Sequence, residues 1–193
     1  FLTLAKENID GAIRKAYQLY EKEPDKYFMP NQYDNDDNVL AHYETTGPEI
    51  FEQTRGDIDI FVAGMGTTGT LIGTSKYLKE KKPQIRIVGV EPAMGHTIQG
   101  LKNLTESIIP KIYQSAILND KITVNDGEAF ETTKLLAQKE GIFVGTSSGA
   151  AAAVALRLAK SIDHGTIVVV LPDRGDRYLS TMQFRSICAK CPP

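Results

Sequence analysis

Three glycines and three threonines stand within seven residues of the sequence, in the run GMGTTGT at residues 64–70. Glycines let backbone N–H groups converge without side-chain obstruction, and threonine hydroxyls add further hydrogen-bond donors. A helix that begins at the end of such a run adds the partial positive charge of its N-terminus. This combination is suited to hold a phosphate dianion. A tight structural turn is the alternative, but the spacing and the neighbouring elements favour phosphate.

The glycine run differs from two widespread phosphate loops. It lacks the lysine that follows the last glycine in a Walker A motif. A dinucleotide-binding loop is followed by an acidic ribose ligand about 20 residues later, and Glu91 meets that requirement only loosely. We therefore expect the phosphate of a small cofactor, with a generic nucleotide-binding protein as an alternative.

Two further polar runs follow apolar segments. Residues 145–149 (GTSSG) read as a small-residue loop before an alanine-rich helix, and residues 172–177 (PDRGDR) follow the apolar residues 166–171. Asp173 is the charged residue nearest to the end of that apolar segment. Because the carboxyl ends of parallel strands meet at one edge of a sheet, these loops and the glycine run should share that edge, where ligands bind.

The elements around the glycine run predict a parallel sheet. Residues 58–63 and 85–91 are β-rich, and residues 70–82 between them read as a helix that ends at Pro83. Strand, glycine loop, helix and strand in this order are typical of a right-handed βαβ unit. We expect a helix over 127–140, a brief strand over 142–144 and a helix over 150–160. The nearly all-apolar residues 166–171 should form a strand buried on both faces.

The remaining segments are less regular. Residues 1–5 read as a short strand, residues 9–22 as an amphipathic helix, and residues 26–39 as an ordered loop or domain connection. Residues 41–54 look helical, with Pro48 forcing a break or a new start. Residues 93–121 show no regular pattern, and we expect them to cover another part of the fold. The predicted fold class is α/β: a three-layer parallel sheet with flanking helices.

Composition narrows the classes of protein. Of 193 residues, 41% are hydrophobic and 24% are charged, which is an ordinary globular composition. The net charge of −2 gives no electrostatic case for a nucleic-acid or anionic-membrane partner. No apolar run approaches the roughly 20 residues of a membrane helix, and no signal-peptide pattern opens the chain.

The two cysteines, Cys188 and Cys191, stand close to the C-terminus as a CxxC pair. Such a pair can ligate zinc or form a redox pair, but no histidine has zinc-ligand spacing to it, so we expect a loose tail and no metal site. A sequence otherwise without cysteine suits a cytoplasmic protein that does not rely on disulfides.

Six runs of the sequence, taken together and in order, resemble the cysteine synthase family, which is a group of pyridoxal-phosphate enzymes of the tryptophan-synthase-β type. The final run is most similar to the B-type O-acetylserine/O-phosphoserine sulfhydrylases. The resemblance extends over nearly the whole chain. The runs are residues 31–33 (NQY), 42–49 (HYETTGPE), 64–70 (GMGTTGT), 88–92 (VGVEP), 145–149 (GTSSG) and 174–181 (RGDRYLST).

The resemblance implies roles for individual residues. Gln32 corresponds to the glutamine that contacts the substrate carboxylate, with Tyr33 beside it where the family usually has Phe. Gly145 lies where the backbone borders cofactor and substrate. Asp173 stands where a serine often binds the pyridine nitrogen, and an acidic residue there favours a protonated ring and a stronger electron sink. The cofactor-phosphate cup corresponds to Gly66, Thr67, Thr68, Gly69 and Thr70.

The largest departure from the family pattern is its Schiff-base lysine, which lies in an N-terminal segment and precedes a Ser/Thr-Gly-Asn loop. Neither feature occurs among these residues, and none of the 15 lysines has that setting. The chain begins with Phe1, so we expect a C-terminal part of a longer protein. Residues 1–30 would be the end of the small domain, residues 31–181 the large cofactor-binding domain, and residues 182–193 a tail.

The resemblance implies an enzyme of cysteine biosynthesis. It would form L-cysteine from an O-activated serine and sulfide by β-replacement on pyridoxal 5′-phosphate, as a homodimer when complete. We expect this chain alone to be inactive or nearly so. Acetylserine and phosphoserine both remain open as donors, as do sulfide and a carrier protein as sulfur source. The alternatives are a cystathionine β-synthase or serine/threonine dehydratase relative, and a non-catalytic cofactor-binding module.

Overall fold

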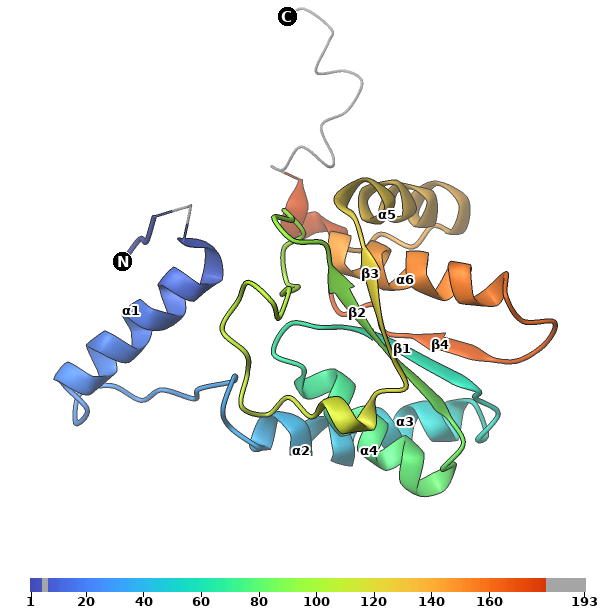
Figure 1. The fold of residues 1–193 in the computed structure, drawn as a ribbon, viewed down its shortest axis with the longest axis horizontal. Coiled ribbons are helices and arrows are strands. Elements are labelled where there is room, and N and C mark those ends of the chain that lie inside the picture. Colours follow the sequence, from blue (N-terminus) through green and yellow to red (C-terminus); the bar gives the residue numbers. More distant parts are fainter. Residues whose placement is uncertain (5–6, 180–193) are drawn as a thin grey trace, which may run out of the picture.

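The computed structural model describes residues 1–4 and 7–179 of the chain. Within these residues, four parallel strands form one sheet in the order β3-β2-β1-β4. Helices α5 and α6 lie on one side of the sheet and α2, α3 and α4 on the other (Figure 1), which confirms the expected α/β fold. The elements are β1 (Ile60–Gly64), β2 (Arg86–Pro92), β3 (Asp120–Val124), β4 (Ile167–Val169), α2 (Asp37–Glu44), α3 (Thr46–Gln53), α4 (Gly69–Lys81), α5 (Asp126–Glu140) and α6 (Thr146–Ala159).

The core divides between the two faces of the sheet because side chains alternate along a strand. Ile60 and Val62 of β1 belong to the buried cluster that contains Val154 of α6. Phe61, which lies between them, belongs to the opposite cluster with Leu71 of α4. Strand β1 is therefore buried on both faces, as a central parallel strand should be.

The predicted βαβ unit is present. Strand β1 leads through the glycine run into α4 and then into β2, and β1 pairs with β2 in parallel. Helix α4 begins at Gly69, one residue earlier than expected. Thr68 immediately before it has a φ of 72°, in the left-handed region that favours glycine.

The expected loop over residues 145–149 is wrong, because α6 begins at Thr146. Close packing explains the helical start: a Cβ on Gly149 would overlap the carbonyl oxygen of Ala129 and the side chain of Thr133, both on α5. The expected strand over residues 142–144 is also wrong. Val144 forms one isolated bridge with Arg174 and does not join the sheet.

Three further expectations on strands need correction. Strand β4 is only partly buried, because it pairs with β1 and forms one edge of the described sheet. Strand β3, whose residues alternate in burial, is not among the expected strands, and it begins within the last two residues of the segment expected to be irregular, 93–121. Residues 1–4 form no strand: Phe1 and Leu2 are fully exposed, and no described strand pairs with them. Residues 5–6 and the tail with Cys188 and Cys191 lie outside the described residues.

Helices α2 and α3 follow each other with a break at Thr45, whose φ of −121° and ψ of −71° are not helical. The break was expected at Pro48 but lies three residues before it. Pro48 occupies the first turn of α3, where a backbone N–H would have no partner within the helix, so its missing N–H costs no hydrogen bond. The loop expected over residues 26–39 ends earlier than predicted, because α2 starts at Asp37.

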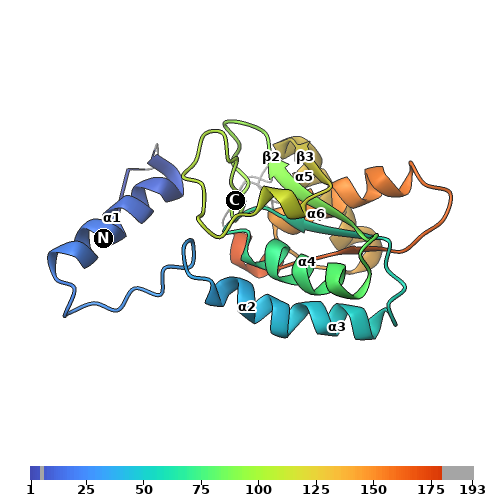
Figure 2. The same ribbon diagram turned by 60° about the horizontal axis from the view of Figure 1, so that its bottom comes forward.

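Helix α1 (Asn8–Lys22) stands apart from the sheet, and residues 23–36 connect it to α2 (Figures 1 and 2). Asp10 anchors the start of α1, because its carboxylate accepts hydrogen bonds from Lys102 Nζ at 2.6 Å and from the N–H of Ile108 at 2.7 Å. Farther along the helix, the Tyr17 hydroxyl lies 2.8 Å from Asp34 Oδ2.

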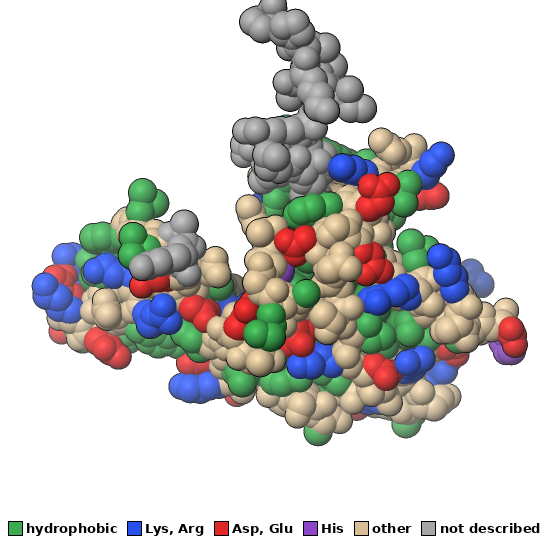
Figure 3. Space-filling model, turned by 45° about the horizontal axis from the view of Figure 1, so that its top comes forward, with side chains coloured by type: hydrophobic (Ala, Val, Ile, Leu, Met, Phe, Trp, Pro, Cys, Tyr) green, Lys and Arg blue, Asp and Glu red, His purple; other side chains and the backbone are tan. Residues whose placement is uncertain are grey.

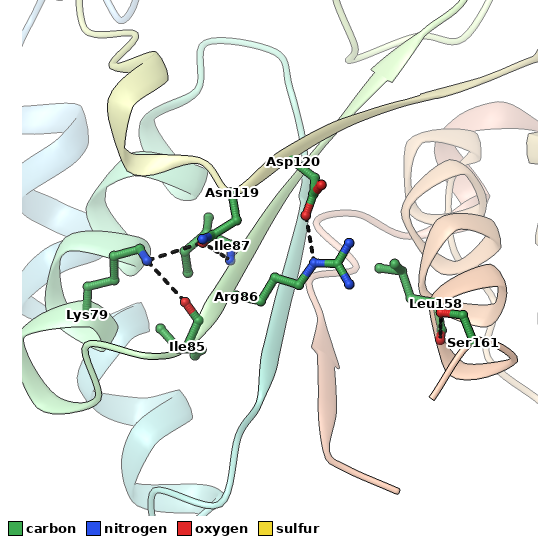
Figure 4. Close-up of polar contacts among 8 residues, drawn as sticks. All are labelled: Lys79, Ile85, Arg86, Ile87, Asn119, Asp120, Leu158 and Ser161. Atoms are coloured by element: carbon green, nitrogen blue, oxygen red, sulfur yellow. Dashed lines mark hydrogen bonds and ion pairs between the residues drawn. The ribbon is translucent and has the colours of Figure 1, made fainter. Parts of the chain in front are cut away.

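A polar network ties together the ends of α4, β2 and β3 that lie away from the glycine run (Figure 4). Lys79 Nζ donates to the carbonyl of Ile85 at 3.1 Å and to Asn119 Oδ1 at 3.2 Å, and the same oxygen accepts from the N–H of Ile87 at 2.8 Å. This network satisfies backbone groups at the starts of strands and serves the sheet rather than a ligand site.

Candidate active site

A cleft of about 1210 Å³ opens at the carboxyl ends of β1 and β4. Its walls come from the glycine run, the start of α1, residues 95–107 and the turn that contains Asp173. Figure 3 shows the part of the chain with α1 projecting from the rest of the molecule, with basic and acidic side chains interspersed on this face. The position at the carboxyl edge of a parallel sheet is the one expected for a ligand.

The glycine run contributes most of the predicted phosphate-binding residues to this cleft. Gly66, Thr67, Thr68 and Thr70 line it, whereas Gly69 does not. The Thr68 hydroxyl is buried and has no hydrogen-bond partner among the described residues. A buried hydroxyl without a partner is unfavourable, so this group is suited to bind a ligand atom.

Asn38 of α2 holds the glycine run from behind, and sequence reasoning missed it. Its Nδ2 donates to Thr67 Oγ1 at 3.2 Å and to the carbonyl of Gln32 at 2.7 Å. A Cβ on Gly69 would overlap the Asn38 side-chain amide, which explains why glycine stands there. No local signal marks Asn38, because both partners are distant in sequence or lie in an irregular loop.

Residues 95–107 cover the glycine run, as expected for the irregular segment. The N–H of Lys102 donates to the carbonyl of Met65 at 2.7 Å. A Cβ on Gly66 would lie 2.5 Å from the carbonyl oxygen of Gly100, so the two backbones are in direct contact. The cleft is therefore closed on this side by main chain.

Asp173 lines the cleft, and two neighbours orient its carboxylate. Tyr178 of the short 3₁₀ helix η3 (Gly175–Tyr178) donates a hydrogen bond to Oδ2, while Oδ1 is buried and has no partner among the described residues. Gly145 does not line the cleft. It lies behind Asp173, and a Cβ there would overlap both the carboxylate and the Tyr178 ring.

Burial and the hydrogen bond to the Asp173 carboxylate raise the pKa of Tyr178 to about 12. The phenol is therefore protonated over the whole physiological range and acts as a constant donor. Tyr178 thus fixes one oxygen of Asp173, whereas Oδ1 is buried beside Gly145 and has no partner among the described residues.

Gln32 and Tyr33 line the opposite wall together with Lys102 and Asp10. The Lys102 ammonium is almost fully buried, 2.6 Å from Asp10 Oδ1 and 4.8 Å from the centre of the Tyr33 ring. Burial and the nearby Asp10 carboxylate raise the pKa of Tyr33, which keeps this phenol neutral. The resemblance pointed to the first two residues, but the buried ion pair was not predicted.

Glu91 does not face the cleft. Its carboxylate is buried and accepts from the N–H of Leu104 at 2.9 Å and from Lys121 Nζ at 2.9 Å. The acidic side chain that a dinucleotide ribose would need is therefore committed to holding the segment that follows β2. This contact weighs against the nucleotide-binding alternative.

Comparison with known proteins shows which family this chain resembles in sequence and in fold. Residues 2–173 match the model of a family described as "Pyridoxal-phosphate dependent enzyme". Cysteine synthase B of Pseudomonas aeruginosa is 42% identical over 180 residues, which are 93% of this chain and 60% of that protein. The chain thus spans about three fifths of the length of this relative.

Two solved structures extend the comparison. The cysteine synthase of Entamoeba histolytica superposes with a TM-score of 0.87 at 36% identity, over 96% of this chain and 57% of that one. An O-acetylserine-dependent cystathionine β-synthase from Helicobacter pylori has a TM-score of 0.84 at 39% identity, over 92% and 60%. With a glycine run at a helix start and an acidic residue across the same cleft, the chain belongs to the pyridoxal-phosphate-dependent enzyme family, as a relative of the cysteine synthases.

Proposed function

We propose that this chain forms the phosphate-holding and ring-edge part of a cysteine synthase, which makes L-cysteine from an O-activated serine and sulfide. The observation that carries the proposal is that two residues lining one cleft each have a buried polar group without a partner among the described residues. These are the Thr68 hydroxyl, a donor for a phosphate, and Asp173 Oδ1, an acceptor for a protonated ring nitrogen. Pyridoxal phosphate presents both partners in one small molecule, so the residues fit this cofactor.

Each part of the site then has a task. The backbone of Gly66 and the hydroxyls of Thr67, Thr68 and Thr70 hold the phosphate at the positive end of α4. Asp173 orients the ring and keeps its nitrogen protonated. When bound, the cofactor supplies an electron sink for the carbanion character that develops at the substrate α-carbon.

Gln32 and Tyr33 are the proposed substrate contacts. The Gln32 amide can donate to a carboxylate, and its backbone carbonyl is already fixed by Asn38 of α2. The Tyr33 ring lies beside the buried Lys102 ammonium on that side of the cleft. Gly145 acts indirectly, by leaving space for Asp173.

We further propose that no lysine of these 193 residues holds the cofactor covalently. Among the described residues that line the cleft, the lysine is Lys102, and its ammonium is engaged by Asp10 and by the carbonyl of Ile108. An ammonium in an ion pair has no free electron pair with which to form an imine. The catalytic base of the whole enzyme would then lie outside this sequence.

Intact mass after incubation with pyridoxal phosphate and borohydride reduction tests for a covalent anchor, and calorimetric titration with pyridoxal phosphate and with pyridoxal tests the cofactor site. We expect pyridoxal phosphate to bind reversibly and more tightly than pyridoxal, which lacks the phosphate. We expect no stoichiometric covalent adduct of the cofactor with the chain. A single adduct on one lysine, or cysteine formation by the purified chain, would overturn the proposed absence of an anchor. A chain that binds neither compound would overturn the cofactor site itself.

A cystathionine β-synthase is the second candidate, because one of the similar solved structures carries that name. The two functions differ in the nucleophile, which is sulfide for cysteine and a larger thiol for cystathionine. Kinetics of the whole enzyme with both nucleophiles would separate them.

We also propose the arrangement of the whole protein. Residues 1–30 would close a small domain, and residues 31–181 would form most of the large domain. The enzyme would be a cytoplasmic homodimer, consistent with a sequence whose only cysteines are Cys188 and Cys191. Sedimentation of the whole enzyme would test the dimer.

A further inference from the structure

The His42 imidazole lies between two threonine hydroxyls on two other helices. Its Nδ1 is 2.8 Å from Oγ1 of Thr46 in the first turn of α3, and its Nε2 is 3.0 Å from Oγ1 of Thr70 in the first turn of α4. Thr70 lines the cleft, whereas His42 lies behind it. Any influence of His42 on a ligand therefore passes through Thr70.

Helix α2 approaches α4 this closely because position 73 is glycine. A Cβ on Gly73 would overlap the carbonyl oxygen of Val39 and would lie 2.8 Å from the Cβ of His42. Val39 and Ile72 belong to one buried cluster at this contact. Packing of the two helices thus fixes the position of the imidazole.

The imidazole has one donor and one acceptor nitrogen. Burial lowers the pKa of His42, so the ring is neutral at neutral pH. If Nε2 carries the proton, it donates to Thr70 Oγ1, and the Thr70 O–H is free to donate into the cleft. If Nδ1 carries the proton, Thr70 must donate to Nε2, and its lone pairs then face the cleft.

We propose that His42 carries its proton on Nε2 and thereby makes Thr70 a hydrogen-bond donor toward the phosphate of a bound ligand. A phosphate dianion offers acceptors only, so its binding selects this arrangement. In this arrangement Thr46 donates its hydroxyl proton to Nδ1 of His42, so three hydrogen-bonding groups are linked in series. His42 is a positioning residue, and the inference rests on the proposed function because the phosphate is that of pyridoxal phosphate.

The test compares two ligands on matched amide variants of the full chain. Calorimetric titration gives the Kd of pyridoxal phosphate and of pyridoxal, and their ratio isolates the phosphate contacts. His42→Gln places an amide near the position of Nε2 and can still donate to Thr70, whereas His42→Asn reaches only toward Thr46. We expect Gln to keep the ratio within about twofold and Asn to reduce it about fivefold, the value of one neutral hydrogen bond.

A Thr70→Val background shows whether the effect passes through Thr70. Valine removes the hydroxyl at nearly constant volume, so His42→Gln and His42→Asn should there have the same ratio. A merely structural role of His42 would weaken binding of both ligands together and leave the ratio unchanged. Should His42→Asn fail to fold by thermal unfolding, Thr46→Val removes the donor to Nδ1 and should lower the ratio instead.

The outcomes separate this inference from the function on which it rests. Equal ratios in His42→Gln, His42→Asn and the unaltered chain would overturn the role of His42 and leave the proposed function standing. An unaltered chain with no preference for pyridoxal phosphate over pyridoxal would overturn the phosphate site and the inference with it.

Discussion

The hydroxyl of Tyr178 donates a hydrogen bond to one oxygen of Asp173, while the other oxygen, although buried, has no partner among the described residues. The carboxylate therefore has one oxygen fixed by Tyr178 and one oxygen buried beside Gly145. Tyr178→Phe should leave the fold intact and let the carboxylate rotate, which weakens pyridoxal phosphate binding about fivefold. Calorimetry on both proteins measures this, and an unchanged Kd would show that Tyr178 does not orient Asp173.

The same pair predicts a loss of stability at alkaline pH. The pKa of Tyr178 is about 12 in the folded chain, above the ordinary value of 10.0. Between these values the unfolded chain releases a proton that the folded chain retains, so the free energy of unfolding falls as pH rises above about 10. Urea unfolding of the unaltered chain and of Tyr178→Phe across this range should show a steeper fall in the former. Parallel curves would contradict the prediction.

Gly145→Ala should damage the site from behind. A Cβ at this position overlaps the Asp173 carboxylate and the Tyr178 ring, so we expect a loss of about 1–3 kcal/mol in the free energy of unfolding, together with weaker cofactor binding. Gly127→Ala is the matched control, because its nearest atom would be Asn125 Oδ1 at 3.4 Å. The control should gain about 0.5 kcal/mol. Chemical denaturation of both variants and of the unaltered chain measures these free energies of unfolding. Equal stabilities of the two variants would contradict the prediction.

Thr68 should show a conflict between stability and binding. Its left-handed backbone is unfavourable for a β-branched residue, so Thr68→Gly should raise the free energy of unfolding by up to about 1 kcal/mol. The same change removes a proposed phosphate ligand and should weaken pyridoxal phosphate binding. Thr68→Ala loses the hydroxyl but keeps a Cβ, so it should lose binding without the gain in stability. Equal melting temperatures for the Gly and Ala variants would refute the strain argument.

Asp10→Asn should release helix α1. The change leaves the buried Lys102 ammonium without its carboxylate, at a cost of about 3 kcal/mol. Limited proteolysis should then cut residues 23–36 faster, whereas Asp25→Asn, an exposed change in the same connection, should not alter the rate. Identical digestion of all three proteins would mean that other contacts hold α1.

The βαβ unit could be predicted because its signals are local. The glycine run, the helix after it and the β-rich segments on either side all lie within 35 residues of sequence, from residue 58 to residue 92. The start of α6 could not be predicted in this way, because small residues of low helix propensity are helical there through packing of Gly149 against α5. Strand β3 does carry a local signal, because Ile122 and Val124 alternate with polar residues.

The same distinction between local sequence signals and long-range packing applies to the residues of the candidate site. The residues that line the cleft from the glycine run, with Asp173, follow from motifs next to strand ends. Asn38 and His42 hold these residues in place from far along the sequence. Asn38 contacts Thr67, 29 positions away, and His42 contacts Thr70, 28 positions away. Such contacts exist only after α2 has packed on α4, so a single sequence gives no pattern from which to infer them.

The close approach of Gly66 to Gly100 has a mechanical consequence. Because main chain touches main chain there, the glycine run cannot shift without displacing residues 95–107, which cover it. The same segment contains Lys102, which donates a hydrogen bond to Asp10 of α1, 92 positions away in sequence. The glycine run, residues 95–107 and the start of α1 are therefore connected by direct contacts. A displacement of the glycine run would therefore be transmitted to the start of helix α1.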